Sequence, residues 1–279
     1  MSPWYYLLAL VEVPLFCLLA YFGGWLWVAF IAFGTCIGLS ELYSHQIVRG
    51  QRPEVAVGVL CGLALLVVAE FLPAEGWGAA AVGVVLVTMA GSLGAQFTRT
   101  GQPGRIRDAA VTVLGVVYIA LPMSFLLLLC KLDVPELVTG ESAGRLKARL
   151  GALLMVTLAV WLSDTAAWAV GHLVGRTKLT PRLSPAKTVE GALAGGGMAL
   201  IVTVLVGLWL GLPLPHGLAL GALIAVISQV GDAAESVIKR DLKLKDFGTV
   251  VGPHGGMLDT FDGLLFAAPL TWFYLQFML

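Results

Sequence analysis

Long apolar runs separated by short polar segments dominate this chain. Nine runs come close to the roughly 20 residues that a transmembrane helix needs, and none has the alternating pattern of a membrane β-barrel strand. The pattern predicts an all-α, polytopic membrane protein with about nine transmembrane helices. The predicted spans are Trp4–Phe22, Trp25–Tyr43, Val55–Leu72, Trp77–Phe97, Ala109–Cys130, Ala148–Val174, Ala192–Leu210, Leu218–Val237 and Met257–Phe277.

Composition agrees with this prediction. Hydrophobic residues make up 58% of the 279 residues and charged residues 12%, against roughly 25% charged residues in a soluble domain. No repeat or soluble domain is visible. We expect one integral membrane unit, with N-terminal transmembrane helices over residues 1–147 and a catalytic transmembrane region over 148–279, because the polar motifs gather in the second half.

Basic residues are distributed unevenly among the loops. With nine spans, the even-numbered loops lie on one side, and they carry 13 of the 17 Lys and Arg. The positive-inside rule then places these loops and the N-terminus in the cytoplasm and the C-terminus outside. The start of the chain, MSPWYYLL, lacks a basic segment, so we expect no cleavable signal peptide. The predicted location is the cell (cytoplasmic) membrane.

The segment Gly231–Gly263 concentrates six carboxylates and four Lys or Arg between two apolar runs. Ionisable groups are expensive at membrane depth, so such a cluster indicates a functional site. Carboxylates that hold a divalent cation, beside cations that hold phosphates, are typical of phosphoryl or nucleotidyl transfer.

Helical spacing orders the polar residues of the eighth predicted helix. Ser228, Asp232, Glu235 and Lys239 recur at intervals of four, three and four, and Gln229, Asp232 and Ser236 form an overlapping stripe. Asp232 belongs to both stripes, so we expect it to point into the protein. A structural Asp–Lys pair is the alternative interpretation.

The ninth predicted helix begins near Gly255-Gly256, and Asp259 and Asp262 lie three residues apart in its first turns. The helix dipole by itself favours carboxylates there. Acids on two neighbouring helices also suit Mg²⁺, which takes one or two carboxylates plus substrate phosphates. We expect His254 to be a hydrogen-bonding loop residue rather than a metal ligand.

Two further polar features precede this segment. Ser163-Asp164 lies midway along the sixth apolar run, as a structural carboxylate or as the lining of a water-filled cavity. The loop from Arg176 to Lys187 holds four cations, two prolines and Ser184, and it either sets topology or binds phosphate. Three acids in the early helices have no assigned role: Glu12, Glu41 and Glu70. Of these, Glu41 is a candidate for lining the same cavity.

Two ordered blocks resemble the phosphatidate cytidylyltransferase (CDP-diacylglycerol synthase) family. The first is SDTAAWAVGHLVGRTKLTPRLSPAKTVEG, and the second is GDAAESVIKRDLKLKD followed after seven residues by HGGMLDTFD. The resemblance covers about Ser163 to Pro269. Three positions depart from the family pattern: Ala186 replaces the usual Asn, Thr260 replaces the usual Arg, and Pro253 precedes the His.

The resemblance implies transfer of a cytidylyl group from CTP to phosphatidic acid, giving CDP-diacylglycerol and pyrophosphate for phospholipid synthesis. It implies Asp232 and Asp259 as ligands of Mg²⁺ or another divalent cation. These two acids, with Asp262 and Lys239, form the expected catalytic set. The expected substrate-binding residues are Asp164, Ser184, Lys187, Glu235, Ser236, Arg240, Lys245, Asp246 and His254.

Two other functions stay open at this point. A CTP-dependent lipid kinase of the polyprenol or phytol type uses similar membrane and metal chemistry but transfers the γ-phosphoryl group. A cation-coupled secondary transporter also uses intramembrane carboxylates, although no internal repeat with paired broken helices is visible. The expected partners are CTP, phosphatidic acid and the lipid bilayer, and no nucleic acid. The oligomeric state stays open, with a homodimer as one candidate.

Overall fold

A computed structural model describes residues 14–99, 106–132, 142–252 and 255–279, with the backbone alone described for 142–149. Of the described residues, 82% are helical, and a described helix overlaps every predicted span. Residues 14–22 belong to the first span, which falls partly outside the described residues. The others correspond to α2 (Gly24–Val48), α3 (Val55–Phe71), α4 (Ala74–Gly94) with the short η1 (Ala95–Thr98), α5 (Ile106–Gly115) with η2 (Val116–Ala120) and α6 (Leu121–Leu129), α7 (Ser142–Val174), α8 (Val189–Leu210), α9 (Leu214–Asp241) and α10 (Met257–Met278).

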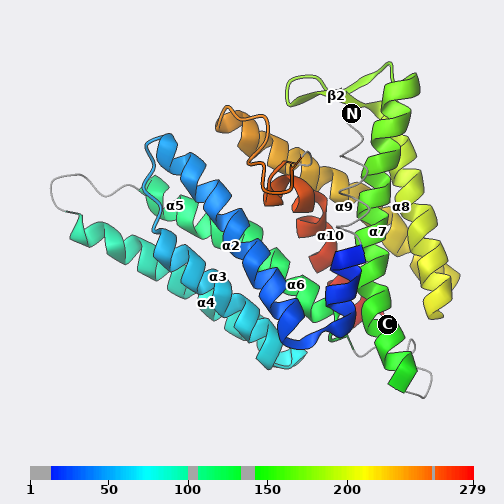
Figure 1. The fold of residues 1–279 in the computed structure, drawn as a ribbon, viewed down its shortest axis with the longest axis horizontal. Helices are drawn as coiled ribbons and strands as arrows, with labels where there is room; N and C mark the ends of the chain where they lie inside the picture. Colours follow the sequence, from blue (N-terminus) through cyan, green and yellow to red (C-terminus); the bar gives the residue numbers. More distant parts are fainter. Residues whose placement is uncertain (1–13, 100–105, 133–141, 253–254) are drawn as a thin grey trace. The chain divides into compact units, whose positions relative to one another are not determined.

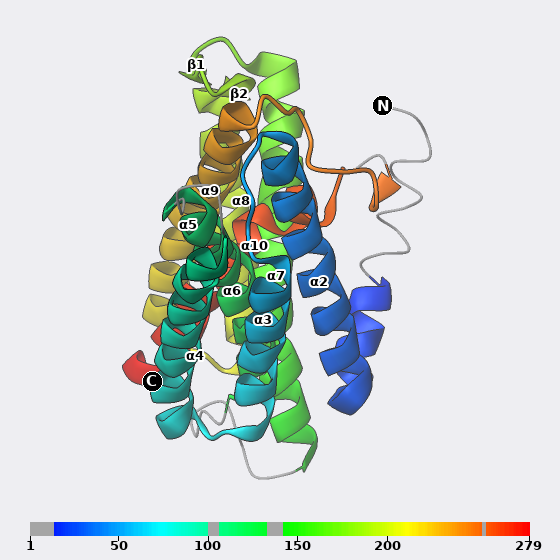
Figure 2. The same ribbon diagram turned by 90° about the vertical axis from the view of Figure 1, so that its left-hand side faces the viewer.

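The chain divides into two compact units. The first unit contains residues 1–128 and 242–260, and the second contains residues 129–241 and 261–279. In the first, α2 packs on α3 and α3 on α4; in the second, α8 packs between α7 and α9 (Figures 1 and 2). Each unit therefore contains a segment that is distant in sequence from its other helices. The predicted division of the chain near residue 147 into two functional parts stays a prediction.

Among the described residues, six helical stretches are long and apolar enough to cross a membrane: Gly24–Val48, Ala74–Thr98, Ile106–Leu129, Leu150–Val174, Val189–Leu210 and Leu214–Asp241. Helix α3 is apolar but has only 17 residues, and α10 is not among the six. The chain is thus a multi-pass membrane protein. The number of nine spans stays a prediction.

The described residues are mostly helical, as the all-α prediction requires, and a short hairpin accompanies the helices. The strands β1 (Lys178–Thr180) and β2 (Ser184–Thr188) pair antiparallel, with Lys178 opposite Thr188 and Thr180 opposite Ser184. The two prolines of this loop are compatible with the hairpin, because Pro181 lies in its turn and Pro185 lies in a strand with one partner, which tolerates a residue without an N–H. The hairpin lies at the end of α7 and the start of α8 (Figure 2).

Tyr43 of α2 organises the interior of the first unit. Its hydroxyl donates a hydrogen bond of 2.8 Å to the carbonyl oxygen of Thr112 in α5, the helix that continues into the π-helical turn η2. A Cβ atom at Gly58 or Gly115 would collide with this side chain. The phenol ring therefore lies where two helices that lack side chains at these positions leave room for it.

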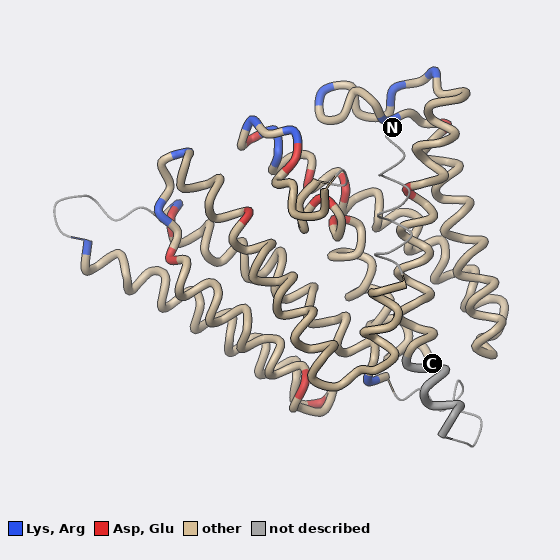
Figure 3. Tube along the Cα trace, viewed as in Figure 1, with Lys and Arg blue, Asp and Glu red and all other residues tan. Residues whose placement is uncertain are grey.

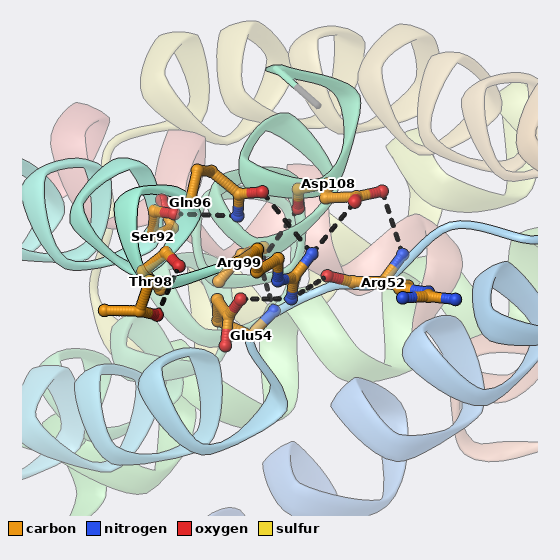
Figure 4. A network of polar contacts seen from close by, with 9 residues as sticks. Arg52, Glu54, Ser92, Gln96, Thr98, Arg99 and Asp108 are labelled. Atoms are coloured by element: carbon orange, nitrogen blue, oxygen red, sulfur yellow. Dashed lines mark hydrogen bonds and ion pairs between the residues drawn. The ribbon is translucent and has the colours of Figure 1, made fainter. Parts of the chain in front are cut away.

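Arg99 joins loops at one end of the first unit (Figure 4). Its guanidinium pairs with Glu54 and, at 3.0 Å, with Asp108, which is 1% exposed. It also donates to the carbonyl oxygen of Arg52 at 2.9 Å, and the N–H of Arg52 donates to Asp108 at 2.8 Å. The loops after the second and fourth predicted helices therefore meet.

Candidate active site

Helices α9 and α10 bring three carboxylates together in the second unit. One oxygen each from Asp232, Glu235 and Asp262 lies within 4.8 Å of the others. Gly231 makes this approach possible, because a Cβ atom there would lie 2.6 Å from the carbonyl oxygen of Asp262. The predicted stripe on α9 thus faces α10, and we call these three residues the acidic cluster.

Two lysines compensate part of this negative charge. Lys187 of β2 forms an ion pair with Asp232, and Lys239 pairs with Glu235 at 2.5 Å, one turn further along α9. Glu235 is fully buried, and a buried charge is tolerated where it is paired. The structural Asp–Lys pair that we considered for α9 is therefore a Glu–Lys pair, and the partner of Asp232 comes from the hairpin.

Asp164 of α7 belongs to the same site. It lies near enough to Asp232 and Lys187 to interact electrostatically with both, and it also interacts with Asp262. Its neighbour Ser163 is 2% exposed. Figure 3 shows acidic residues within the helices of this unit and basic residues on the hairpin and at the end of α9. Helices α7, α9 and α10 and strand β2 therefore all contribute charged groups.

The hairpin block contains structural as well as chemical residues. Thr188 caps α8 by accepting the N–H of Gly191 at 3.2 Å. The Glu190 carboxylate accepts the N–H groups of Arg176 and Thr177 at 3.1 Å, which closes the base of the hairpin. These contacts account for the Thr and Glu of the block without any catalytic role, and they hold Lys187 next to the acidic cluster.

Arg240 connects the hairpin turn to the end of α9. Its Nε donates to the carbonyl oxygen of Leu183 at 2.9 Å. Ser184 follows at the start of β2 and is half-buried, and Ser236 is buried on α9. The loops after the sixth and eighth predicted helices therefore meet at one end of the second unit.

Asp259 has different contacts from Asp262, although both lie at the start of α10. Its Oδ2 accepts the N–H of Phe247 at 2.8 Å and the N–H of Gly256 at 2.7 Å. An acid three residues after the cap that accepts the cap N–H is half of a capping box. The acidic cluster contains Glu235 and Asp262 beside Asp232, and the assignment of Asp259 as a metal ligand stays a prediction.

The remaining predicted residues lie in the first unit or outside the described part of the chain. Lys245 and Asp246 are exposed in the segment after α9, with an ion-pair distance of 3.9 Å. Thr260, which replaces the usual Arg, donates its hydroxyl to the carbonyl oxygen of Gly256 at 3.0 Å. His254 and Pro253 lie outside the described residues.

The sequence indicated Glu41 only as a candidate for lining the cavity, yet this residue contacts the motif region directly. Glu41 of α2 accepts hydrogen bonds from the N–H groups of Met257 and Leu258. In the sequence, Glu41 stands out only as a carboxylate within an apolar run, and Glu12 and Glu70 have the same property. Spacing along one helix cannot identify a partner that lies 216 residues away.

The acidic cluster has the donor chemistry of a divalent-cation site. Carboxylate oxygens are the ligands that Mg²⁺ prefers, and Mg²⁺ commonly takes its remaining ligands from substrate phosphates and water. The adjacent lysines supply positive charge for phosphate groups. Such a combination of acids and lysines suits transfer between phosphates.

The comparisons with known proteins match nearly the whole chain. The model of the cytidylyltransferase family matches residues 5–278. A phosphatidate cytidylyltransferase of Synechocystis sp. is 32% identical over 97% of this chain and 95% of its own length. A protein of the same name from Staphylococcus haemolyticus is 28% identical over 95% of each chain.

A shorter match has higher identity. The phosphatidate cytidylyltransferase of Aquifex aeolicus is 41% identical over 44% of this chain and 46% of its own length. Since the family model and the relative from Synechocystis both extend over almost all of the sequence, this chain belongs to the cytidylyltransferase family.

Proposed function

We propose that this protein transfers a cytidylyl group from CTP to phosphatidic acid and forms CDP-diacylglycerol and pyrophosphate. Three relatives that are named phosphatidate cytidylyltransferase support the proposal. The observation that carries it is the acidic cluster with Lys187 and Lys239, because these residues all belong to the two motif blocks. The relatives are named neither as lipid kinases nor as transporters, so those two alternatives are not favoured.

The reaction does not require a strong general base. An oxygen of the lipid phosphate is already ionised at neutral pH, and it attacks the α-phosphorus of CTP. The new bond joins this phosphorus to the lipid phosphate, the bond to the β-phosphate oxygen breaks, and pyrophosphate leaves. The protein must therefore position the two phosphates in line and stabilise the negative charge of the transition state.

The lysines and the arginine are suited to hold the phosphates. Lys187 and Lys239 each form an ion pair with the acidic cluster, so they lie beside any phosphate bound there. Arg240 is exposed and reaches the hairpin turn. We assign Lys187, Lys239 and Arg240 to the triphosphate and the lipid phosphate, and Ser184 to their orientation.

We also propose that Asp232, Glu235 and Asp262 hold Mg²⁺ or another divalent cation, with Asp259 as the further ligand that the family resemblance implies. A bound divalent cation supplies positive charge that neutralises the triphosphate. The protein's part is to hold the oxygen ligands close together, and the 4.8 Å limit on their separation supports this.

The side of the membrane and the assembly are further proposals. We place the active site on the cytoplasmic side of the cell membrane, because 13 of the 17 Lys and Arg lie in loops that we predict to share one side. The contacts of Arg99 with Glu54 and of Arg240 with Leu183 support this grouping. A homodimer is the proposed assembly, and light scattering of the purified protein tests it.

Product analysis tests the proposed reaction. Purified protein in detergent is incubated with phosphatidic acid, Mg²⁺ and CTP that is labelled in the cytosine ring. We expect labelled CDP-diacylglycerol and an equal amount of pyrophosphate. A phosphorylated lipid with free CDP would indicate a kinase instead, and a wild-type protein that forms neither product would refute the proposal.

A further inference from the structure

Helix α2 and its C-cap residue present three polar side chains at four-residue spacing, which places them on one face. They are Glu41, His45 and Arg49, and we call them the α2 stripe. All three form hydrogen bonds with the backbone of the segment 242–258, which contains the connection from α9 to α10 and the first two residues of α10. Both partners in each contact belong to the first unit.

Glu41 holds the first turn of α10. Its two carboxylate oxygens accept the N–H of Met257 at 2.9 Å and the N–H of Leu258 at 3.1 Å. These N–H groups have no acceptor within their own helix, and a negative charge at a helix N-terminus is favoured by the dipole. Glu41 is 8% exposed, so water does not readily replace its carboxylate as the acceptor.

The backbone closes tightly around this carboxylate. A Cβ atom at Gly248 would lie 2.8 Å from Oε1 of Glu41, and a Cβ atom at Gly256 would collide with the same oxygen. Both glycines belong to the segment between the two helices. The segment is therefore shaped to fit the carboxylate of Glu41, which is more than a single hydrogen bond requires.

The other two members hold the rest of the segment. Nε2 of His45 donates to the carbonyl oxygen of Phe247 at 2.7 Å. Arg49 donates to the carbonyl oxygen of Leu242 through Nε at 3.1 Å and Nη2 at 2.5 Å. Leu242 directly follows the last residue of α9. A cation thus lies at the end of one helix and an anion at the start of the next, which are the signs that the helix dipoles favour.

This segment also determines where Asp259 lies, since the Asp259 carboxylate accepts the N–H groups of Phe247 and Gly256. Phe247 is bonded to His45, and Gly256 directly precedes the residue bonded to Glu41. We infer that the α2 stripe, with Glu41 as its main member, positions Asp259 and the first turn of α10 for cytidylyl transfer. The inference rests on the proposed function, and it makes Glu41 a positioning residue.

The test substitutes Glu41→Gln in the full-length protein. Glutamine keeps the size of the side chain but replaces one acceptor oxygen by an NH₂ group that faces a backbone N–H. We expect kcat to fall about tenfold or more per folded molecule, while the KM values for CTP and phosphatidic acid stay within about threefold. The matched control is Glu75→Gln, an exposed carboxylate in the first turn of α4, which we expect to leave both constants unchanged.

Hydrogen exchange followed by mass spectrometry separates positioning from a general structural role. In Glu41→Gln, amide exchange should rise in the peptides that cover 242–258 and stay unchanged in α7 and α8. A rise throughout the protein, with activity lost only in proportion to folded protein, would overturn the inference. A normal kcat for Glu41→Gln would overturn it as well.

A milder variant covers the case in which Glu41→Gln does not fold. His45→Phe keeps an aromatic ring next to Phe247, where the ring centroids are 6.1 Å apart, and it removes only the hydrogen bond. We expect a smaller fall in kcat with the same local rise in exchange, and normal values of both would refute the inference.

If the wild-type protein forms no CDP-diacylglycerol, the proposed function fails and the inference fails with it. An active wild type together with normal variants overturns the inference alone.

Discussion

Replacing Asp262 by Asn should lower activity without lowering stability. Asp262 contributes one of the three carboxylates of the acidic cluster, and its Oδ1 accepts the N–H of Gly263 at 2.5 Å. Asparagine has nearly the same shape and keeps an oxygen for this bond. The substitution therefore removes a negative charge and a strong cation ligand, and it changes little else.

The structure sets the size of both effects. Two carboxylate charges 4.8 Å apart repel each other by about 3 kcal/mol at an effective dielectric constant of about 20. Four carboxylates interact in this site, namely those of Asp164, Asp232, Glu235 and Asp262, while two lysines pair with them. Removing one charge relieves repulsion in the folded state. The free energy of unfolding should therefore not fall, and it should rise by up to about 3 kcal/mol.

Activity should change in the opposite direction. The loss of one charged ligand from a cation site costs several kcal/mol of transition-state stabilisation, which corresponds to a fall in rate on the order of a thousandfold. A group that lowers stability while supporting activity is typical of an active site. The opposite signs of the two effects therefore distinguish a catalytic carboxylate from a structural one.

Both quantities are measurable on the same purified sample. CDP-diacylglycerol formation gives the rate, and the thermal midpoint in detergent gives the stability. Asp241→Asn is the matched control, because Asp241 is the exposed last residue of α9, and it should change neither value. Normal turnover by Asp262→Asn, or a clearly lower thermal midpoint, would refute the reasoning.

Three further predictions follow from the sequence and the site. Asp259→Asn should leave the protein folded, since an amide oxygen still accepts backbone N–H groups. If Asp259 binds the cation, the substitution should lower CDP-diacylglycerol formation on the order of a thousandfold. Near-normal turnover would rule out Asp259 as a cation ligand. The C-terminus should lie outside and the hairpin inside; a reporter fused after Leu279 checks this, and a cytoplasmic reporter would contradict nine spans. Thr260→Arg should leave activity unchanged or raise it. The hydrogen bond that the hydroxyl loses is local to α10, and a charge-assisted phosphate contact is roughly twice as strong as a neutral one. Strongly reduced turnover by this variant would show that the pocket depends on threonine.

Local patterns in the sequence determined much of this protein. Apolar runs of about 20 residues predicted the helices, because a membrane helix must cover its length with apolar side chains. Helical spacing predicted the stripe on α9, since residues three and four apart share a face. The motif blocks indicated the family and most of the acidic and basic residues that the second unit brings together.

Tertiary packing decided which of these residues are partners. Asp259 and Asp262 are equivalent by spacing, yet Asp259 accepts backbone N–H groups and Asp262 joins the acidic cluster. The partner of Asp232 is Lys187, which comes from a hairpin that hydropathy did not predict. Glu41 reaches the start of α10 across 216 residues. Such pairs depend on how helices cross, and crossing depends on close contacts such as that of Gly231 with Asp262. The periodicity of a single helix contains no information about them.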